Sequence, residues 1–298
     1  MSELIELQTF VAVAQSGSFA AAARRLGLTP ALVGRRIQSL ESRHGVKLIE
    51  RTTRAQRLTA LGEAFREKAS AVIETLDALN DLTRPDAGQL TGRIRMTAAT
   101  TIGILRLAAI LGRFAERHPS VVVEMSLNDR RVDLISGGFD LAVRIGELTP
   151  SSLIAKRVGT YSFVCCAAPD YLTRFGTPQT PEELAEARCI LNLNLVPRNL
   201  WPFVDPGGQR RAIEVQGAIE LDNGEAQRAA ALAGAGIIYA PRLLVADDLA
   251  AGTLIPVLPN WRTISLPIHT VYPSRQFVPR RITALVEAIA NGLRADFS

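Results

Sequence analysis

Two short helices near the N-terminus constrain the fold more strongly than any other feature of the sequence. Ser18 is a typical N-cap residue and precedes an alanine-rich segment that Gly27 ends. Thr29 and Pro30 begin a second helix, and Gly45 stops it. Because only a tight turn separates them, the two helices predict a helix-turn-helix, a motif whose second helix enters the major groove of DNA.

The segments around this motif extend the same interpretation. Residues 4–15 carry apolar side chains at helical spacing, and residues 47–58 predict two short strands around a basic turn, which is a wing. Thr59 then begins a helix to about Arg84, roughly 37 Å long at 1.5 Å per residue. We expect its apolar stripe to pair with a second copy of the chain, and the alternative is that it lies on the rest of this chain.

The positive charge of the chain is concentrated at the same end. The formal net charge is +5, from 34 Lys and Arg residues and 29 Asp and Glu residues. The first 60 residues hold nine basic and four acidic residues, whereas the remainder holds 25 of each. A small basic module on a neutral body indicates contact with a polyanion. A solvated arginine-rich surface would give the same counts.

From Gly92 the sequence alternates between strand and helix patterns. Strands are expected at 93–97, 121–127, 141–145, 161–167, 213–221, 237–240 and 269–272. Helices are expected at 102–117, 132–136, near 181–187, and at 225–233, 243–250 and 279–293. Repeated strand–helix units predict an α/β region with mainly parallel sheets.

A string of residues in the first 62 positions resembles the LysR family of bacterial transcription regulators. Its members are Leu7, Phe10, Gly17, Ser18, Phe19, Ala22, Ala23, Leu26, Thr29, Pro30, Ile37, Leu40, Glu41, Gly45, Leu48, Arg51, Arg54, Leu58, Thr59 and Gly62. Later strings resemble the effector domain of the same family, at 139–146, 167–172, 230–237, 249–258 and 272–273. The resemblance therefore spans the chain.

The resemblance implies a multidomain protein, with an all-α winged helix-turn-helix domain, a long linker helix and an α/β effector domain of two subdomains similar to type 2 periplasmic binding proteins. The expected domains are 1–60 for DNA binding, 61–91 for the linker and dimerisation helix with its hinge, and 92–298 for effector binding. Subdomain 1 would comprise 92–161 and 269–298, and subdomain 2 would comprise 162–268. The implied partners are double-stranded promoter DNA, a small-molecule effector bound between the subdomains, and further copies of the chain in a homodimer or homotetramer.

The expected DNA-binding residues lie at the start of each helix of the motif, along the second helix and on the wing. They are Ser18, Thr29, Pro30, Ala31, Gly34, Arg35, Gln38, Arg51, Thr52, Thr53 and Arg54. Arg35 is expected to pair with guanine and Gln38 with adenine, and phosphate contacts are the alternative for both. Ala31 and Gly34 stand where the family tends to have Ser, and Gly34 costs up to about 1 kcal/mol of helix stability relative to Ala.

The expected effector-binding residues lie at the carboxyl ends of strands, where open α/β sheets bind ligands. They are Thr100, Thr101, Asn128, Arg144, Asn194 and Asn223. Hydroxyls and free amides at Thr100 and Thr101 would suit a carboxylate, which Arg144 could also pair with. The alternative partners of Arg144 are three nearby aspartates, Asp129, Asp133 and Asp140.

Several other classes of protein are not expected. No apolar run approaches the roughly 20 residues of a membrane span, and the N-terminus lacks the basic start of a signal peptide, so a cytoplasmic location is expected. The three cysteines, Cys165, Cys166 and Cys189, lack metal-ligand spacing, and no catalytic constellation is visible. We therefore expect no cofactor, metal or enzymatic activity; the alternatives are a solute-binding protein or an enzyme with an accessory helix-turn-helix.

Overall fold

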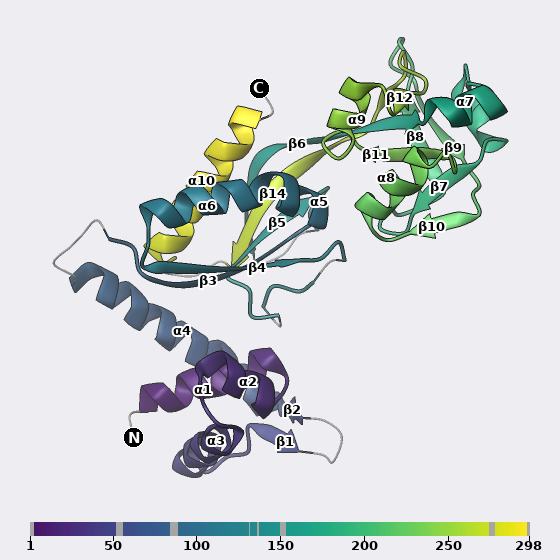
Figure 1. The fold of residues 1–298 in the computed structure, drawn as a ribbon. Coiled ribbons are helices and arrows are strands. Elements are labelled where there is room, and N and C mark those ends of the chain that lie inside the picture. Colours follow the sequence, from purple (N-terminus) through teal and green to yellow (C-terminus); the bar gives the residue numbers. More distant parts are fainter. Residues whose placement is uncertain are drawn as a thin grey trace.

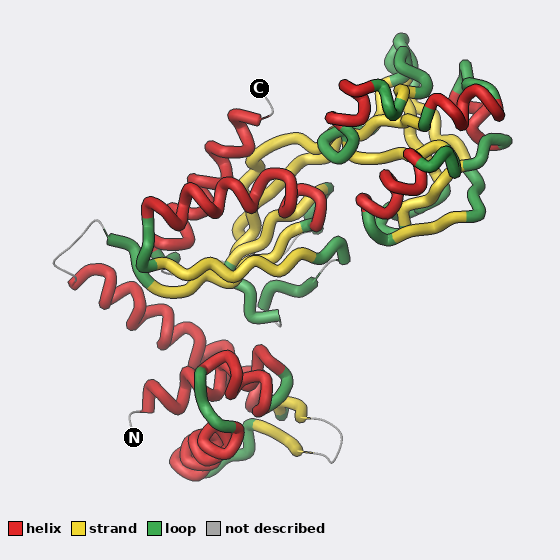
Figure 2. The backbone as a smooth tube through the Cα atoms, in the orientation of Figure 1, coloured by secondary structure: helices red, strands yellow, loops and turns green. Residues whose placement is uncertain are grey.

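The computed structural model describes residues 3–51, 56–83, 89–130, 132–135, 137–149, 153–273 and 278–296. Figure 1 shows a helical N-terminal module, the long helix α4 (Ala60–Thr83), and a larger α/β region made of two lobes. In the same orientation, Figure 2 shows strands that run from one lobe into the other.

The N-terminal module contains the predicted helix-turn-helix. Its elements are α1 (Glu3–Ser16), α2 (Phe19–Leu26), α3 (Pro30–His44) and the wing strands β1 (Ile49–Arg51) and β2 (Gln56–Leu58). The predicted caps are confirmed, because the Ser18 hydroxyl accepts a hydrogen bond from the Ala21 amide at 3.1 Å and the Thr29 hydroxyl accepts one from the Leu32 amide at 3.3 Å. Left-handed glycines end both helices, as the sequence predicts.

The wing is attached to α3 by a buried carboxylate. Glu41 Oε1 accepts hydrogen bonds from the amides of Leu48 at 2.9 Å and Ile49 at 3.1 Å, and Oε2 pairs with Lys47 at 2.9 Å. Burial alone would raise the pKa of Glu41, but the hydrogen bonds from Lys47, Leu48 and Ile49 outweigh it and lower the pKa. The ionised form is therefore part of the fold.

The long helix has the predicted start and length. The Thr59 hydroxyl accepts a hydrogen bond from the Gly62 amide at 2.9 Å, and α4 then continues for 24 residues. Phe65 packs edge-on against Phe10 of α1, with ring centroids 5.4 Å apart. The first turns of α4 are therefore part of the core of the N-terminal module.

The first lobe is built on parallel strands. Its elements are β3 (Gly92–Ala98), α5 (Thr100–Ile102), the π-helical segment Gly103–Leu107, α6 (Ala108–Arg117), β4 (Val121–Leu127), β5 (Leu141–Ile145) and α10 (Arg280–Asp296). β3 lies between β4 and β5 and is parallel to both. Helices α6 and α10 contact each other and cover this sheet (Figure 1).

The second lobe repeats this arrangement and adds a small separate sheet. Its elements are α7 (Pro169–Phe175), a 3-10 helix (Pro181–Ala185), β7 (Cys189–Asn192), β8 (Leu200–Val204), β9 (Arg210–Glu214), β10 (Ile219–Leu221), α8 (Gly224–Leu232), β11 (Ile237–Pro241), α9 (Ala246–Ala251), β12 (Ile255–Pro256) and β13 (Arg262–Thr263). Two long strands, β6 (Leu153–Ala167) and β14 (Ser265–Pro273), join the lobes in the order β10-β7-β11-β6-β14-β5-β3-β4. Both pair antiparallel with their neighbours, so parallel pairing is confined to each lobe and the expectation of mainly parallel sheets is only partly right.

Two expected elements are wrong. Residues 132–135 form loop and turn where a helix was expected. The Arg144 side chain donates a hydrogen bond to the Val132 carbonyl, and the Arg66 side chain donates one to the Ile135 carbonyl. The single strand expected at 213–221 is two strands of different sheets, β9 and β10. The chain bends between them at Gly217, which packs closely on the backbone of β7. A Cβ at this position would lie only 1.7 Å from the Cys189 carbonyl oxygen, so only glycine fits there.

We predict that Glu41→Gln loosens the wing. The glutamine side chain has one neutral carbonyl oxygen in place of the two charged oxygens of the carboxylate. The wing amides would therefore lose hydrogen bonds to a charged group, which contribute about 1.5–3 kcal/mol each. Hydrogen exchange of the Leu48 and Ile49 amides should accelerate at pH 7. The depressed pKa of Glu41 means that its contribution is complete above the ordinary value of 4.5 and is lost as the pH falls through the lower folded pKa.

The matched control is Glu50→Gln, which removes the same charge from an exposed position in β1. Its amide exchange should match that of the wild type. Acidification should lower the protection factors of the Leu48 and Ile49 amides, relative to intrinsic exchange at each pH, less in the Glu41 variant than in the wild type. Equal acid sensitivity of these protection factors in the two proteins would contradict the role given to this carboxylate.

Candidate functional site

The start of α3 presents the residues expected to contact DNA. Thr29, Pro30, Ala31, Arg35 and Gln38 are all exposed, whereas the opposite face of α3 is buried in the module. Within the described part of the chain, neither Arg35 nor Gln38 has a side-chain hydrogen bond or ion pair. Figure 1 places α3 on the side of the module that is remote from the α/β region. This surface is therefore open to a large partner.

Two polar neighbours on the same helix face inward instead. Arg36 donates to the Thr9 hydroxyl at 3.2 Å, and the Ser39 hydroxyl donates to the buried carboxylate of Glu6 at 2.7 Å. Arg43 pairs with Glu6 at 3.2 Å. The hydrogen bond from Ser39 lowers the pKa of Glu6, burial opposes this shift and Arg43 reinforces it. These contacts fix the rotation of α3 about its axis, so that Arg35 and Gln38 point outward.

The other expected DNA contacts are placed only in part. Gly34 is not required by packing, because a Cβ there would meet only the Phe19 ring at 3.9 Å. Ser18 is half-buried at the start of α2, where its hydroxyl is the helix cap. Arg51 ends β1, whereas Thr52, Thr53 and Arg54 lie outside the residues that the structure describes.

In the first lobe, the carboxylate of Asp129 binds the start of α5. Thr100 begins this helix, and its amide donates to Asp129 Oδ1 at 2.7 Å. The expectation of a free amide at Thr100 is therefore wrong. Because β3 and β4 are parallel and Ala98 is opposite Leu127, Asp129, two residues beyond the end of β4, lies over the start of the helix that follows β3. An anion is stabilised there by the helix dipole.

The two lobes approach each other beside this helix start. A Cβ on Gly224, the first residue of α8, would lie 3.1 Å from the Thr101 hydroxyl oxygen. Burial raises the pKa of Tyr161, a hydrogen bond with Thr101 opposes the shift, and Asp129 adds to it. The structure therefore brings Thr101, Asp129 and Tyr161 together with the start of α8.

The remaining expected effector residues have local hydrogen-bond partners. Asn128 Oδ1 accepts from the Arg130 amide at 2.9 Å, and Asn223 caps α8 by accepting from the Ala226 amide at 3.0 Å. Asn194 Nδ2 donates to the Asp222 carbonyl at 2.6 Å, so Asn194 and Asn223 lie at the same edge of the second lobe.

Arg144 donates to the Val132 carbonyl. Two of its three alternative aspartate partners are engaged elsewhere, since Asp129 accepts from Thr100 and Asp140 accepts from the Arg95 amide at 2.9 Å. Arg144 therefore helps to hold the loop that follows β4.

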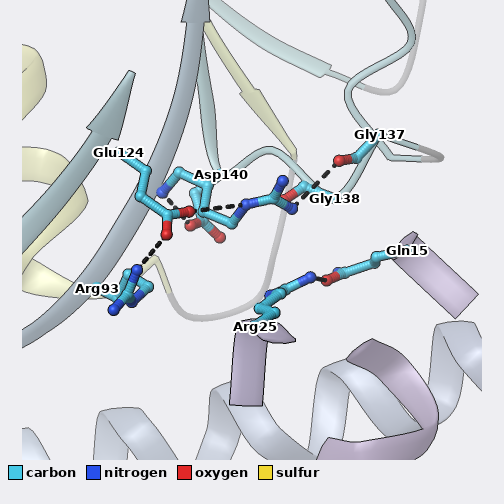
Figure 3. Close-up of polar contacts among 8 residues, drawn as sticks. Gln15, Arg25, Arg93, Glu124, Gly137, Gly138 and Asp140 are labelled. Atoms are coloured by element: carbon cyan, nitrogen blue, oxygen red, sulfur yellow. Dashed lines mark hydrogen bonds and ion pairs between the residues drawn. The ribbon is translucent and has the colours of Figure 1, made fainter. Parts of the chain in front are cut away.

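The N-terminal module also contacts the first lobe directly. Figure 3 shows the side chain of Gln15, at the end of α1, extending to the side chain of Arg25. Arg25 donates to Gln15 Oε1 at 2.6 Å, and a Cβ on Gly138 would lie 2.7 Å from the Gln15 Cδ. Arg66 of α4 donates to the Ile135 carbonyl at 3.2 Å, which is a second contact with the same loop.

An arginine of β3 shapes the loop that receives Gln15. Arg95 donates to the carbonyls of Gly138 at 2.8 Å and Gly137 at 3.3 Å, and it pairs with Glu124 of β4 at 3.1 Å. Glu124 also pairs with Arg93 (Figure 3). The contact surface for the N-terminal module is thus tied to the backbone of β3 and β4.

A helix-turn-helix with an outward recognition face, joined to a two-lobed α/β region, defines a DNA-binding transcription regulator with a ligand-binding region. The family model for the bacterial regulatory helix-turn-helix protein, lysR family, matches residues 4–63, and the model for the LysR substrate binding domain matches residues 87–294. The chain belongs to the LysR family of transcription regulators.

Relatives and solved structures agree with this assignment over the whole chain. The HTH-type transcriptional regulator YhjC of Escherichia coli is 35% identical over 297 residues, covering 99% of both chains. A repressor of Pseudomonas aeruginosa, PA14_22550, is 32% identical and covers 96% of this chain and 90% of its own. The structure of the regulator CrgA from Neisseria meningitidis is 30% identical, with a TM-score of 0.63 over 98% of this chain and 99% of that chain.

In the part of the chain that the structure describes, no helix is both long and apolar enough to cross a membrane. Among the same residues, no group of three or more His, Cys, Asp or Glu side chains could hold a metal ion.

Sequence reasoning missed two parts of this arrangement. The sequence indicates Asp129 only as a partner of Arg144, although its position two residues after a strand parallel to β3 is a signal for a helix cap. The contact of Gln15 with Gly138 joins residues over 120 positions apart and has no local signal, apart from the glycine pair at 137 and 138.

We predict that Gly138→Val separates the N-terminal module from the first lobe. The added side chain would overlap Gln15. The radius of gyration of the full-length protein, measured by small-angle X-ray scattering, should therefore increase. The control is Gly252→Val, because Gly252 has a similar left-handed φ of 72° and nothing within 4 Å of its Cβ position. Both variants carry a backbone penalty of about 1–2 kcal/mol, so only the loss of contact distinguishes them. Equal radii for the two variants would contradict the prediction.

Proposed function

We propose that this regulator reads a specific operator chiefly through Arg35 and Gln38. The observation that carries this proposal is the exposure of both side chains on the outward face of α3, without an intramolecular partner in the described part of the chain. Arginine pairs bidentately with guanine, and glutamine with adenine. Ala31 and Gly34 offer no side-chain hydrogen bond. Arg35 and Gln38 would therefore supply the polar base contacts of this helix.

Arg35→Ala should weaken operator binding about 10- to 100-fold, because a bidentate base contact is worth about 1–3 kcal/mol of discrimination. Footprint titration on the region upstream of the gene should show this loss, while binding to random DNA falls far less. Arg174→Ala removes an exposed arginine of the second lobe and should leave both affinities unchanged. An equal loss on operator and random DNA would identify a phosphate contact and contradict base reading.

We further infer that the protein acts as a homodimer or homotetramer on promoter DNA in the cytoplasm, with α4 as a pairing helix. Leu61 and Val72 support this inference, because both remain about half exposed on α4, at 49% and 51%. Residues 1–60, 61–91 and 92–298 would then be its DNA-binding, linker and effector-binding parts.

The effector is inferred to be a small carboxylate that binds where α5 and α8 begin. Such a ligand would replace Asp129 at the Thr100 amide and would lie beside Thr101 and Asn223. The exchange suggests how binding is communicated, because Asp129 follows β4 and the same strand carries Glu124. Glu124 pairs with Arg95, which holds the carbonyls of the loop that receives Gln15 of the DNA-binding module.

Asp129→Asn should therefore tighten carboxylate binding about tenfold, because a neutral cap competes less well for the amide and no longer repels the ligand; a hydrogen bond to a charged group is worth about 1.5–3 kcal/mol. Calorimetry of the full-length protein with succinate, pyruvate and acetate, which lack an aromatic body, measures the change. Asp247→Asn, at an exposed position of α9, controls for net charge. Weaker binding in the Asp129 variant, or no binding of any carboxylate to the wild type, would contradict the proposal.

A further inference from the structure

The second lobe contains a cavity of about 1000 Å³ that is distinct from the proposed effector site at the starts of α5 and α8. It lies between the second-lobe end of β6, the hairpin of β8 and β9, and the segment 256–266. None of the six expected effector residues lines it. Its only contribution from the first lobe, within the described residues, is Glu147 beyond the end of β5.

The floor of this cavity is apolar. Phe163, Phe203, Val257 and Leu258 line it and are all at most 6% exposed, and Trp261 is half-buried at its wall. A ligand that reaches this floor would exchange water for aromatic and aliphatic surface, which favours a ligand with an apolar body.

The rim of the cavity is cationic. Arg210, Arg242 and Arg262 come from three separate segments, and all three are exposed and line the cavity. None of them has a side-chain hydrogen bond or ion pair in the part of the chain that the structure describes. Other arginines of this lobe do form ion pairs, since Arg211 pairs with Glu182 at 2.7 Å. The three rim arginines therefore leave a local excess of positive charge, against one lining carboxylate.

The backbone at the cavity floor is also unusual. Leu258 has a φ of 57°, and it is the one residue other than glycine with a positive φ in the described ranges. A bulky side chain rarely adopts this conformation, and such outliers concentrate at ligand sites. The turn is held by the Trp261 amide, which donates to the Leu258 carbonyl at 2.9 Å, and by the Val257 amide, which donates to the Cys165 carbonyl at 2.8 Å.

We propose that this cavity is a second ligand site, which binds an organic anion with an aromatic body and a carboxylate group. The aromatic body would lie on Phe163, Phe203 and Trp261, and the carboxylate would be held by the rim arginines, whose planar guanidinium groups pair with carboxylates in a bidentate manner. The site is independent of the effector cleft, because it uses different residues of the second lobe.

Calorimetry of full-length protein with 2-naphthoate tests the proposal. Arg242→Gln combined with Arg262→Gln should weaken naphthoate binding at this site at least tenfold, and Arg174→Gln should leave it unchanged as a matched exposed arginine. Thr101→Val, which alters the effector cleft, should also leave it unchanged. Undiminished affinity in the double variant, or loss of all naphthoate binding in the Thr101 variant, would overturn the proposal.

Two further probes separate the charge from the apolar body. Naphthalene-2-methanol, which lacks the charge, should bind at least tenfold more weakly than 2-naphthoate. Inorganic phosphate, which lacks the apolar body, should also bind at least tenfold more weakly than 2-naphthoate. If either probe binds as tightly as naphthoate, the assignment of an aromatic carboxylate is overturned.

Discussion

The antiparallel pairing of β6 with β14 is the interaction on which the α/β region depends. The ladder runs from Ser265 opposite Ser162 to Pro273 opposite Leu153, and its two ends belong to different lobes. The strands of the first lobe attach through β5 to β14, and the core strands of the second lobe attach through β11 to β6. The register shifts between Ile268 and His269, where β6 carries an extra residue, Val158, and such a bulge bends the strand that contains it. These two strands therefore set how the strand ends of the two lobes face each other.

The elements that could be predicted from the sequence are those with local signals. Ser18 and Thr29 cap helices through residues three positions away, and both helix starts are found where the sequence places them. Strand β8 was missed, although its partner β9 is close to it in sequence. The first half of β6 was also missed, because it pairs with β14, a strand distant in sequence. The strand expected at 213–221 shows the same limit, since the bend at Gly217 is set by its contact with the backbone of β7.

The candidate sites follow the same division. Arg35 and Gln38 could be placed on an exposed face, because the helical period alone separates them from Val33 and Ile37. The cap of Asp129 on Thr100 requires knowledge that β3 and β4 are parallel neighbours, which is a property of the whole sheet. The cavity in the second lobe depends on segments that meet only after folding, so no spacing in the sequence indicates it.

The arginines of the chain divide into those that hold the fold and those that have no partner in the described structure. Arg43 and Arg95 pair with Glu6 and Glu124, and through these carboxylates they join helix to helix and strand to strand. Arg35 and the three rim arginines of the second lobe hold no such contact. An exposed ion pair contributes only about 0–1 kcal/mol, so leaving these side chains unpaired costs little stability. They retain their hydrogen-bond donors for an external anion, which is the common chemistry of the operator surface and of the cavity.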